Sequence, residues 1–439
     1  MTSPEISSYI TQYFEGGRKM KLSHRFGEMG RAVWNLVRWV VLATITGAAV
    51  GFLTGLFGMA ISVVTEFRLA HSLMLLGLPA AGLVIVFLYR IFGLADDTGT
   101  NRVILAIREQ KDIPIAVAPL IVIATVLTHA FGGSSGREGA ALQFGGSLGN
   151  FAARKLKFDA SSTEIMVMTG MSAAFAALFG TPLAATILPM EFVSVGVLYY
   201  AALVPCVISA FTAHAVAVRM NVQRLQIPYE VTDVPNLYSS AFLKVVLLGV
   251  IFAAVGIGFI ICLHTSGQYL KKWFSNQYIR ILVGGTAVAA LALLLGTQDY
   301  IGLGSNVIHA CFDGNAVWYA AVLKVLFVCL TLESGYKGGE IVPSFFIGAV
   351  VGCSLSRIIG LPADICTACG MCSVFCAVTN SPISALCVAF ELFGFDGMGY
   401  FAISVAVSYM MSGYYSLYGA QKIMYSKTET KFINRTTGG

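Results

Sequence analysis

Apolar stretches long enough to cross a lipid bilayer recur along this chain of 439 residues. Two examples are VVLATITGAAVGFLTGLFGMAI (40–61) and AFLKVVLLGVIFAAVGIGFIICL (241–263), and a spanning helix needs roughly 17–25 such residues. Charged residues make up 11% of the chain, whereas soluble domains contain about 25%. A helix satisfies its own backbone hydrogen bonds where no water is available. The sequence therefore predicts an all-α integral membrane protein that crosses the lipid bilayer many times.

Glycine and proline interrupt many of these apolar segments. The chain contains 46 glycines, which suit close helix packing and helices that break within the membrane. We expect roughly 16–18 helical pieces, many of them tilted or ending at membrane depth. The formal net charge is +6, but no basic soluble face is visible, so we expect no nucleic-acid partner.

An internal repeat is the second organising feature. The segment GMSAAFAALFGTPLAATILPMEF (170–192) matches GMCSVFCAVTNSPISALCVAFEL (370–392) at an offset of 200 residues. Two repeats of a membrane unit normally have inverted topology and meet at a site near the bilayer midplane. Glu191 and Glu391 occupy equivalent positions, which favours a structural role for both, such as capping a neighbouring helix.

The repeat and the charge pattern predict four segments. The ends of the chain are basic, so both termini are expected in the cytoplasm of a cell whose plasma membrane holds the protein. The expected segments are a cytoplasmic N-terminal segment (1–33), a first membrane repeat (34–225), a second membrane repeat (226–418) and a short cytoplasmic tail without a regulatory domain (419–439).

Four cysteines have the spacing that bacterial ferredoxins use to bind an iron–sulfur cluster. They are Cys366, Cys369, Cys372 and Cys376. On a helix all four fall on one face, where small residues favour helix packing, and the proline that ends the ferredoxin motif is replaced by Ala377. We therefore expect neither a metal site nor a cofactor, and an iron–sulfur redox protein is the distant alternative.

A glycine-rich segment in the first half places charges inside an apolar region. GGSSGREG contains Arg137 and Glu138 immediately before a predicted helix. Ionisable groups at membrane depth are expensive and mark ion or proton pathways. Backbone N–H groups at a helix N-terminus favour an anion. The Glu138 carboxylate can occupy that anion position itself and leave it when protonated. An ion pair with Arg137 is the alternative, although adjacent residues on a helix point apart.

The second half repeats this arrangement. KGGEIVPSFF (337–346) has glycines, then Glu340, then a helix with Pro343 in its first turn. Two helix N-termini directed at one place would make an anion pathway without a full positive charge in it. Glu340 is a candidate for a proton route, and capping its own helix is the alternative role.

These motifs and the paired repeat resemble the CLC family of chloride channels and anion/proton antiporters. The resemblance rests on GREG at 136–139 and GGE-x-x-P at 338–343, and it covers about residues 30–420. It implies a homodimer with a separate pathway in each subunit, and it implies that Glu138 is the external gate. A tyrosine near the last helix contacts the anion in that family. Tyr418 is the best match here, with Tyr414 and Tyr415 as weaker candidates.

The departures from the family pattern favour one branch. The stretch DDTGTNRVILAI (96–107) lacks the usual serine and proline, and either Thr98 or Thr100 takes the serine position. Phe192 follows Glu191 where many antiporters have a second acid, and Glu340 stands where many members have an apolar residue. This combination resembles the fluoride-exporting branch, which exchanges fluoride for protons.

The sequence thus predicts a transporter, not an enzyme, which exports fluoride in exchange for protons. A chloride/proton antiporter and a passive chloride channel are the alternatives within the family. The predicted partners are fluoride or chloride ions, protons, the lipid bilayer and a second copy of the chain. The residues expected to line the anion path are Thr98, Thr100, Gly136, Arg137, Gly139, Ala140, Glu340, Ile341, Val342 and Tyr418.

Overall fold

The computed structural model describes residues 22–223, 231, 234–238 and 240–437. Most of the predicted cytoplasmic segment 1–33 therefore lies outside the described residues. The described residues form sixteen α-helices, two 3-10 helices and three short strands, so the predicted helical class and the expected number of helical pieces are confirmed.

The first half contains eight α-helices, two 3-10 helices and one strand. In chain order they are α2 (Leu22–Ala70), η1 (Ser72–Gly77), α3 (Leu78–Ile91), α4 (Thr100–Glu109), α5 (Val117–Ala130), α6 (Glu138–Lys155), α7 (Ala160–Phe179), α8 (Pro182–Glu191), β1 (Ser194–Val195), η2 (Tyr200–Ala202) and α9 (Leu203–Arg219).

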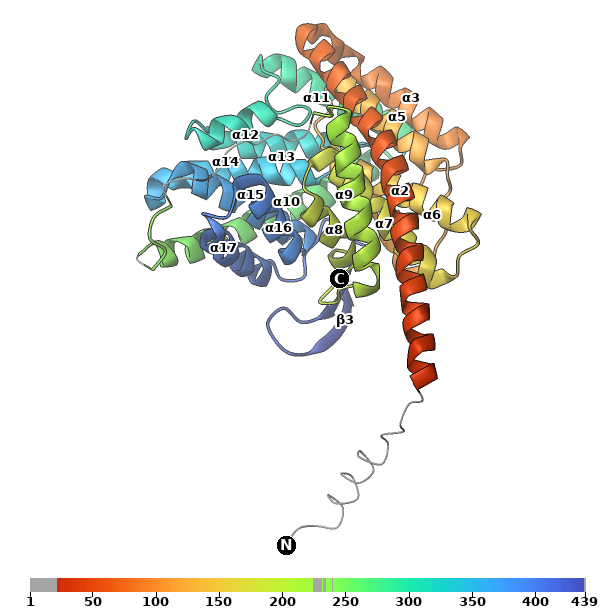
Figure 1. Ribbon diagram of the computed structural model, residues 1–439. Helices are drawn as coiled ribbons and strands as arrows, with labels where there is room; N and C mark the ends of the chain where they lie inside the picture. Colours follow the sequence, from red (N-terminus) through yellow and green to blue (C-terminus); the bar gives the residue numbers. More distant parts are fainter. Residues whose placement is uncertain (1–21, 224–230, 232–233, 239, 438–439) are drawn as a thin grey trace.

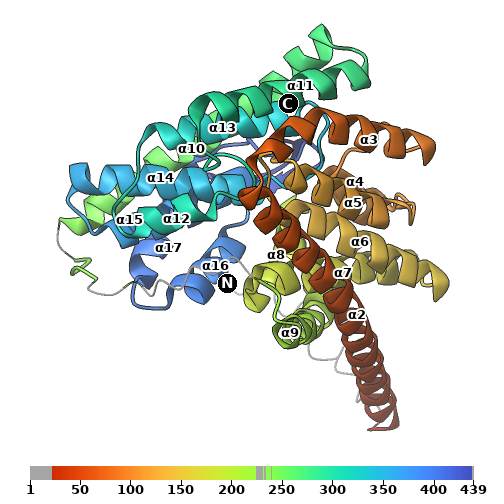
Figure 2. The same ribbon diagram turned by 90° about the horizontal axis from the view of Figure 1, so that it is seen from above.

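The second half contains another eight α-helices and two strands. They are α10 (Ala241–Trp273), α11 (Gln277–Leu295), α12 (Ser305–Phe312), α13 (Tyr319–Leu332), α14 (Ile341–Ile359), α15 (Ala363–Thr379), α16 (Pro382–Phe393), α17 (Met398–Met411), β2 (Lys422–Tyr425) and β3 (Phe432–Thr436). Helices α5–α9 and α14–α17 lie on opposite sides of the molecule in both views (Figures 1 and 2).

Seven of the described helical segments are long and apolar enough to cross a membrane. Their outward surfaces carry large hydrophobic side chains such as Leu243, Leu294 and Ile358. Five further apolar helices are 10–17 residues long and include α5, α13 and α15. This mixture of long and short helices is the predicted pattern of tilted and broken pieces.

Glycines let equivalent helices touch backbone to backbone in the two halves. A Cβ atom on Gly170 of α7 would lie 2.1 Å from the carbonyl oxygen of Gly145 in α6. A Cβ atom on Gly370 of α15 would lie 2.1 Å from the carbonyl oxygen of Gly348 in α14. Small residues permit such close packing in lipid, and the same contact recurs in both repeats.

In each half, one glutamate caps the start of a helix in the other half. The Glu391 carboxylate of α16 accepts hydrogen bonds from the backbone N–H groups of Leu183 and Ala184 at 2.8 and 2.9 Å, at the start of α8. The Glu191 carboxylate at the end of α8 accepts the corresponding bonds from Ile383 and Ser384 at 2.9 and 2.8 Å, at the start of α16. This reciprocal exchange is the signature of an approximate two-fold axis, as inverted repeats require.

The four cysteines of the ferredoxin-like spacing are buried on one continuous helix, α15. Among the residues that the structure describes, no group of three or more His, Cys, Asp or Glu side chains is placed to hold a metal ion. The helix that contains these cysteines packs against α14 and α17, so they fill helix interfaces.

The segment after the last helix is the main departure from the helical pattern. Strand β2 pairs in parallel with β1 of the first half and antiparallel with β3, so the tail forms a hairpin (Figure 1). The hydroxyl of Thr437 donates a hydrogen bond of 2.7 Å to the carbonyl of Tyr418. The hairpin therefore fixes the loop that leads out of α17, a contact that the sequence did not predict.

Candidate functional site

Helices α6 and α14 begin side by side at the contact between the halves. The segments before them form an antiparallel bridge, in which the N–H of Gly136 donates to the carbonyl of Gly339 at 2.7 Å. The N–H of Gly339 donates in return at 2.8 Å. A Cβ atom on Gly339 would lie 2.5 Å from the backbone nitrogen of Gly139, so this approach requires glycine. The two helix N-termini thus come together, as the motifs predict.

The Glu138 side chain is buried at the first position of α6. Its Oε2 accepts a hydrogen bond of 3.0 Å from the backbone N–H of Arg137, while its Oε1 has no hydrogen-bond partner. The carboxylate therefore occupies the positive end of its own helix, where an anion would bind. One oxygen remains poorly satisfied, which is costly for a buried charge.

The expectation that Arg137 and Glu138 point apart is wrong. Arg137 Nε lies 3.7 Å from Glu138 Oε1, and both side chains are buried. Arg137 precedes the helix with a φ of −118°, so the spacing rule for residues within a helix does not apply to it. A second guanidinium nitrogen, Nη2, donates to the carbonyl of Gln223 at 2.8 Å.

Glu340 is the residue before the first turn of α14. Its Oε2 is buried without a hydrogen-bond partner, and a Cβ atom on Gly139 would lie 3.3 Å from it. Ala140 lies in the first turn of α6 and Ile341 and Val342 in that of α14, where all three side chains are buried. Those residues could reach an anion only through their backbone N–H groups.

Glu340 lines a cavity of about 470 Å³, which we call the tyrosine cavity. Thr98, Thr100 and Tyr418 line it too, so the structure brings together four predicted site residues from three separate parts of the chain. The Thr100 hydroxyl lies 3.5 Å from the carbonyl oxygen of Gly139, in the first turn of α6. Thr98 is more exposed than Thr100, which is buried.

Of the three candidate tyrosines, Tyr418 is the one that lines the tyrosine cavity. Its side chain is 2% exposed, its hydroxyl is buried without a hydrogen-bond partner, and its ring packs edge-on against Phe192 at 5.5 Å. The Tyr414 hydroxyl instead lies 3.3 Å from the Ser426 hydroxyl, and Tyr415 is 43% exposed. A buried, unpartnered hydroxyl beside a cavity is suited to contacting a ligand.

The cavity also contains a charged network that sequence reasoning missed. The fully buried Asp97 carboxylate contacts Arg102 Nε at 2.6 Å and Lys337 Nζ at 3.6 Å. It accepts a hydrogen bond of 3.0 Å from Gln143 Nε2 of α6. The signal was present, because Asp97 directly precedes the threonine loop and Lys337 directly precedes the second glycine motif.

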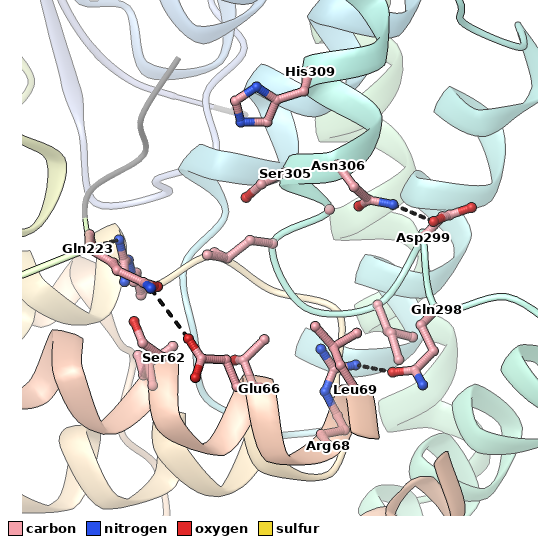
Figure 3. Close-up of a pocket in the computed structure, with 16 residues that line it drawn as sticks. Ser62, Glu66, Arg68, Leu69, Gln223, Gln298, Asp299, Ser305, Asn306 and His309 are labelled. Carbon is pink, nitrogen blue, oxygen red and sulfur yellow. Dashed lines mark hydrogen bonds between the residues drawn. The ribbon is translucent and has the colours of Figure 1, made fainter. Parts of the chain in front are cut away.

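A second cavity of about 540 Å³ lies beside the start of α6, and we call it the arginine cavity. It is lined by Arg137 and by the buried Arg68 from the end of α2. Figure 3 shows Arg68 beside Gln298, with 3.2 Å between Nη1 and the amide oxygen. Arg137, directly before α6, thus lines this cavity, while Gln143 of α6 lines the tyrosine cavity.

Paired helix N-termini with a cavity beside each suit the binding of an anion. Comparison with known proteins agrees with this interpretation. The sequence profile described as "Voltage gated chloride channel" matches residues 81–413. The chain belongs to that family, as its motifs indicated.

Several relatives resemble the chain over most of its length. A "Chloride/fluoride channel protein" of Pseudomonas syringae pv. tomato is 32% identical over 399 residues, which cover 89% of this chain and 88% of that protein. An "H(+)/Cl(-) exchange transporter ClcA" of Salmonella arizonae is 25% identical, with 87% of each chain covered.

A solved structure described as "a CLC-type fluoride/proton antiporter" superposes with a TM-score of 0.85 at 34% identity. The match covers 88% of this chain and 98% of that one. "A slow cyanobacterial Cl-/H+ antiporter" has a TM-score of 0.75 at 19% identity, with 85% and 94% covered, and so supports the fold alone. The family, the helical class and the inverted repeats agree with what the sequence predicted.

Proposed function

We propose that this protein is a secondary active antiporter that exports fluoride in exchange for protons. The observation that carries the proposal is Glu138, whose buried carboxylate fills a helix N-terminus and leaves one oxygen without a hydrogen-bond partner. Such a group can alternate between two states, charged in the anion position or neutral and displaced from it.

The exchange follows from competition for the same backbone donor. While Glu138 is ionised, its Oε2 accepts the Arg137 N–H, and a transported anion cannot take that place. Protonation removes the negative charge, so the carboxyl group leaves and the N–H becomes free for an anion. Each opening of the anion path thus requires a proton, which couples the two movements.

The tyrosine cavity offers chemistry that fits fluoride. The hydroxyls of Thr100 and Tyr418 can donate hydrogen bonds, and the Tyr418 hydroxyl has no other partner. Glu340 lies beside them and can pass on a proton when its carboxyl is neutral. Fluoride is small and basic, so it associates with such donors. Val342, three residues after Gly339, has no hydroxyl group and therefore adds no side-chain hydrogen-bond donor.

Two relatives with 32% and 34% identity have fluoride in their names or titles, and one of them is called an antiporter. The other is called a channel, and the more distant ClcA relative exchanges protons for chloride by its name. A passive channel and a chloride/proton antiporter are therefore the two rival functions. Phe192, which replaces a second acid, disfavours the chloride exchanger.

The same proposal includes the setting of the protein. We place it as a homodimer in the plasma membrane, with one pathway in each subunit and both termini in the cytoplasm. The arginine cavity then faces the exterior and the tyrosine cavity faces the cytoplasm. The repeats are proposed to extend over residues 34–225 and 226–418, which fits the recurring helix order on either side of residue 225.

The test is anion efflux from proteoliposomes loaded with fluoride or chloride, with external pH recorded at the same time. We expect fluoride efflux with proton uptake in the wild type, and a loss of proton movement of about a hundredfold or more in Glu138→Gln, because the amide cannot ionise. Glu109→Gln, which changes an exposed carboxylate that lines neither cavity, is the control. Fast chloride flux without proton movement would establish a channel instead.

A further inference from the structure

Two buried arginines line the arginine cavity, and a buried lysine lies close to it. Arg68 and Arg137 both line it, and each side chain is 3% exposed. Lys324 of α13 is fully buried, and its Nζ donates to the carbonyls of Gly302 and Tyr300 at 2.7 and 3.3 Å. Burying cations without paired carboxylates is expensive, so this arrangement calls for a reason.

Arg68 and Lys324 both lie next to one loop that helps to line the cavity. Ile301 and Leu303 of this loop line the cavity, and the loop carbonyl of Gly302 holds Lys324. A Cβ atom on Gly302 would lie 3.3 Å from Arg68 Nη2. The charges of Arg68 and Lys324 therefore act on the same small volume, with Arg137 on the gate side.

A carboxylate pairs with only one of these three cations in the described part of the chain. Among the described residues, no carboxylate lies within 4 Å of Arg68 or Lys324, and Glu138 is the one within that distance of Arg137. The two acids of the cavity bond to amides instead. Glu66 accepts from Gln223 Nε2 at 3.3 Å (Figure 3), and Asp299 accepts from Asn306.

The donors of Arg68 are not all used. Its Nη1 donates to the Gln298 amide oxygen, while its Nε is buried without a hydrogen-bond partner. Arg137 Nε is likewise buried without one. A weakly hydrated guanidinium with free donors that lines a cavity is suited to bind an anion.

We propose that the arginine cavity holds a second anion-binding site, formed by Arg68 and Arg137 over the buried charge of Lys324. Its ligand is a small monovalent anion, the one that the proposed function moves, so the inference rests on that function for its purpose. The site concentrates the anion next to Glu138 and hands it over when that carboxyl group is displaced. Arg68 is thus a binding residue that the family motifs do not contain.

The test separates affinity from turnover. In proteoliposomes, Arg68→Gln should raise the half-saturating fluoride concentration about tenfold, which corresponds to about 1.4 kcal/mol of lost binding. The maximal flux at saturating fluoride should stay within about twofold of the wild type, because the gate and its coupling are untouched. Arg68→Lys retains the charge and should recover most of the affinity. Arg219→Gln removes an exposed arginine that lines neither cavity and should change nothing.

Calorimetric titration of the detergent-purified proteins with sodium fluoride and sodium chloride repeats the comparison without transport. Equal anion affinity of wild type and Arg68→Gln in both measurements would overturn the proposal. So would Arg68→Lys behaving as badly as Arg68→Gln, since that would indicate a packing role. If the wild type moves anions without protons, the antiporter proposal fails, while the affinity comparison with the transported anion still decides the role of Arg68.

Discussion

Two pairs of glutamates occupy matching places in the two halves, and they behave in opposite ways. Glu191 and Glu391 obey the two-fold relation, since each carboxylate accepts two backbone N–H bonds from the helix start of the other half. Glu138 and Glu340 break it. The first folds back onto its own helix start, while the second faces the tyrosine cavity, and each leaves one oxygen unpartnered.

We therefore assign a structural role to the first pair and propose a functional role for the second. A buried carboxylate whose oxygens are all bonded has one stable position, so it holds the fold together. A buried carboxylate with an unsatisfied oxygen has a reason to move or to take up a proton. The proposed pathway thus combines an approximately symmetric frame with two acids that have different surroundings.

The largest effect is expected at the structural pair. Glu191→Ala leaves two backbone N–H groups and the Ser384 hydroxyl, which donates at 2.6 Å, without an acceptor. Since each buried unsatisfied group costs about 1–3 kcal/mol, we expect a loss of about 3 kcal/mol or more. Glu391→Ala should cost less, about 1 kcal/mol, because it removes two bonds at a half-buried position.

The two variants are compared by thermal unfolding in detergent, followed by tryptophan fluorescence and size-exclusion chromatography. Glu191→Gln retains one acceptor oxygen and serves as the matched milder change. If the alanine variants at 191 and 391 were equally stable, the greater burial of Glu191 would not make its cap stronger. The predicted difference between the two caps would then be wrong.

The next effect concerns the asymmetric pair. Glu340→Gln keeps the shape of the side chain but cannot ionise, so we expect proton movement to fall by about tenfold or more while anion flux persists at a reduced rate. Glu333→Gln is the matched control, as it changes a neighbouring acid that also lines the tyrosine cavity. Simultaneous recordings of anion efflux and pH measure the ratio of the two ions. An unchanged ratio would assign Glu340 to capping of α14.

Much of this contrast can be predicted from the amino-acid sequence alone. The apolar spans, the repeat at an offset of 200 residues and the two glycine motifs predicted the class, the inverted halves and the meeting of α6 with α14. Those features depend on composition and on local backbone chemistry. Equivalent positions in the repeat also pointed to a structural role for Glu191 and Glu391.

Contacts between distant segments could not be predicted in the same way. Arg68 and Lys324 lie in different halves and meet through a loop that carries no motif. The adjacency of Arg137 and Glu138 depended on one backbone angle before the helix. The pairing of β2 with β1 joins segments more than two hundred residues apart, and no local pattern in either strand specifies that partner.

A smaller effect is expected at Tyr418, where the two halves meet over the cavity. Tyr418→Phe removes one buried hydroxyl without an existing protein partner, so the protein should be as stable as the wild type. If the hydroxyl binds the anion, the half-saturating fluoride concentration should rise about three- to tenfold, since one hydrogen bond contributes about 0.5–1.5 kcal/mol net and about 1.4 kcal/mol corresponds to a tenfold change in affinity. Tyr415→Phe, at an exposed position, is the control for the flux assay. An unchanged half-saturating concentration would leave Thr100 as the main hydroxyl ligand.

The smallest effect concerns another difference between the halves. It lies at the corner where α7 ends before α8 and where α15 ends before α16. Gly180 forms this corner in the first half, whereas the second half has Asn380, which is contacted by Lys427 of the C-terminal hairpin. Lys427 Nζ also donates to the Ser412 hydroxyl at 2.8 Å. Burial lowers the pKa of Lys427 from 10.5 to about 8. Only the second corner is therefore held by a group that titrates near physiological pH.

The sign of the pH effect follows from proton binding. Between about pH 8 and 10.5, undocked Lys427 holds more protons than docked Lys427, so docking of the hairpin strengthens as pH rises through this window. Hydrogen exchange in β2 and β3, corrected for the intrinsic rate, should show protection that increases by less than about tenfold per pH unit between pH 8 and 9.5. Lys427→Met should abolish the increase and leave exchange in α8 unchanged. The same pH dependence in both proteins would mean that a titratable group other than Lys427 causes it.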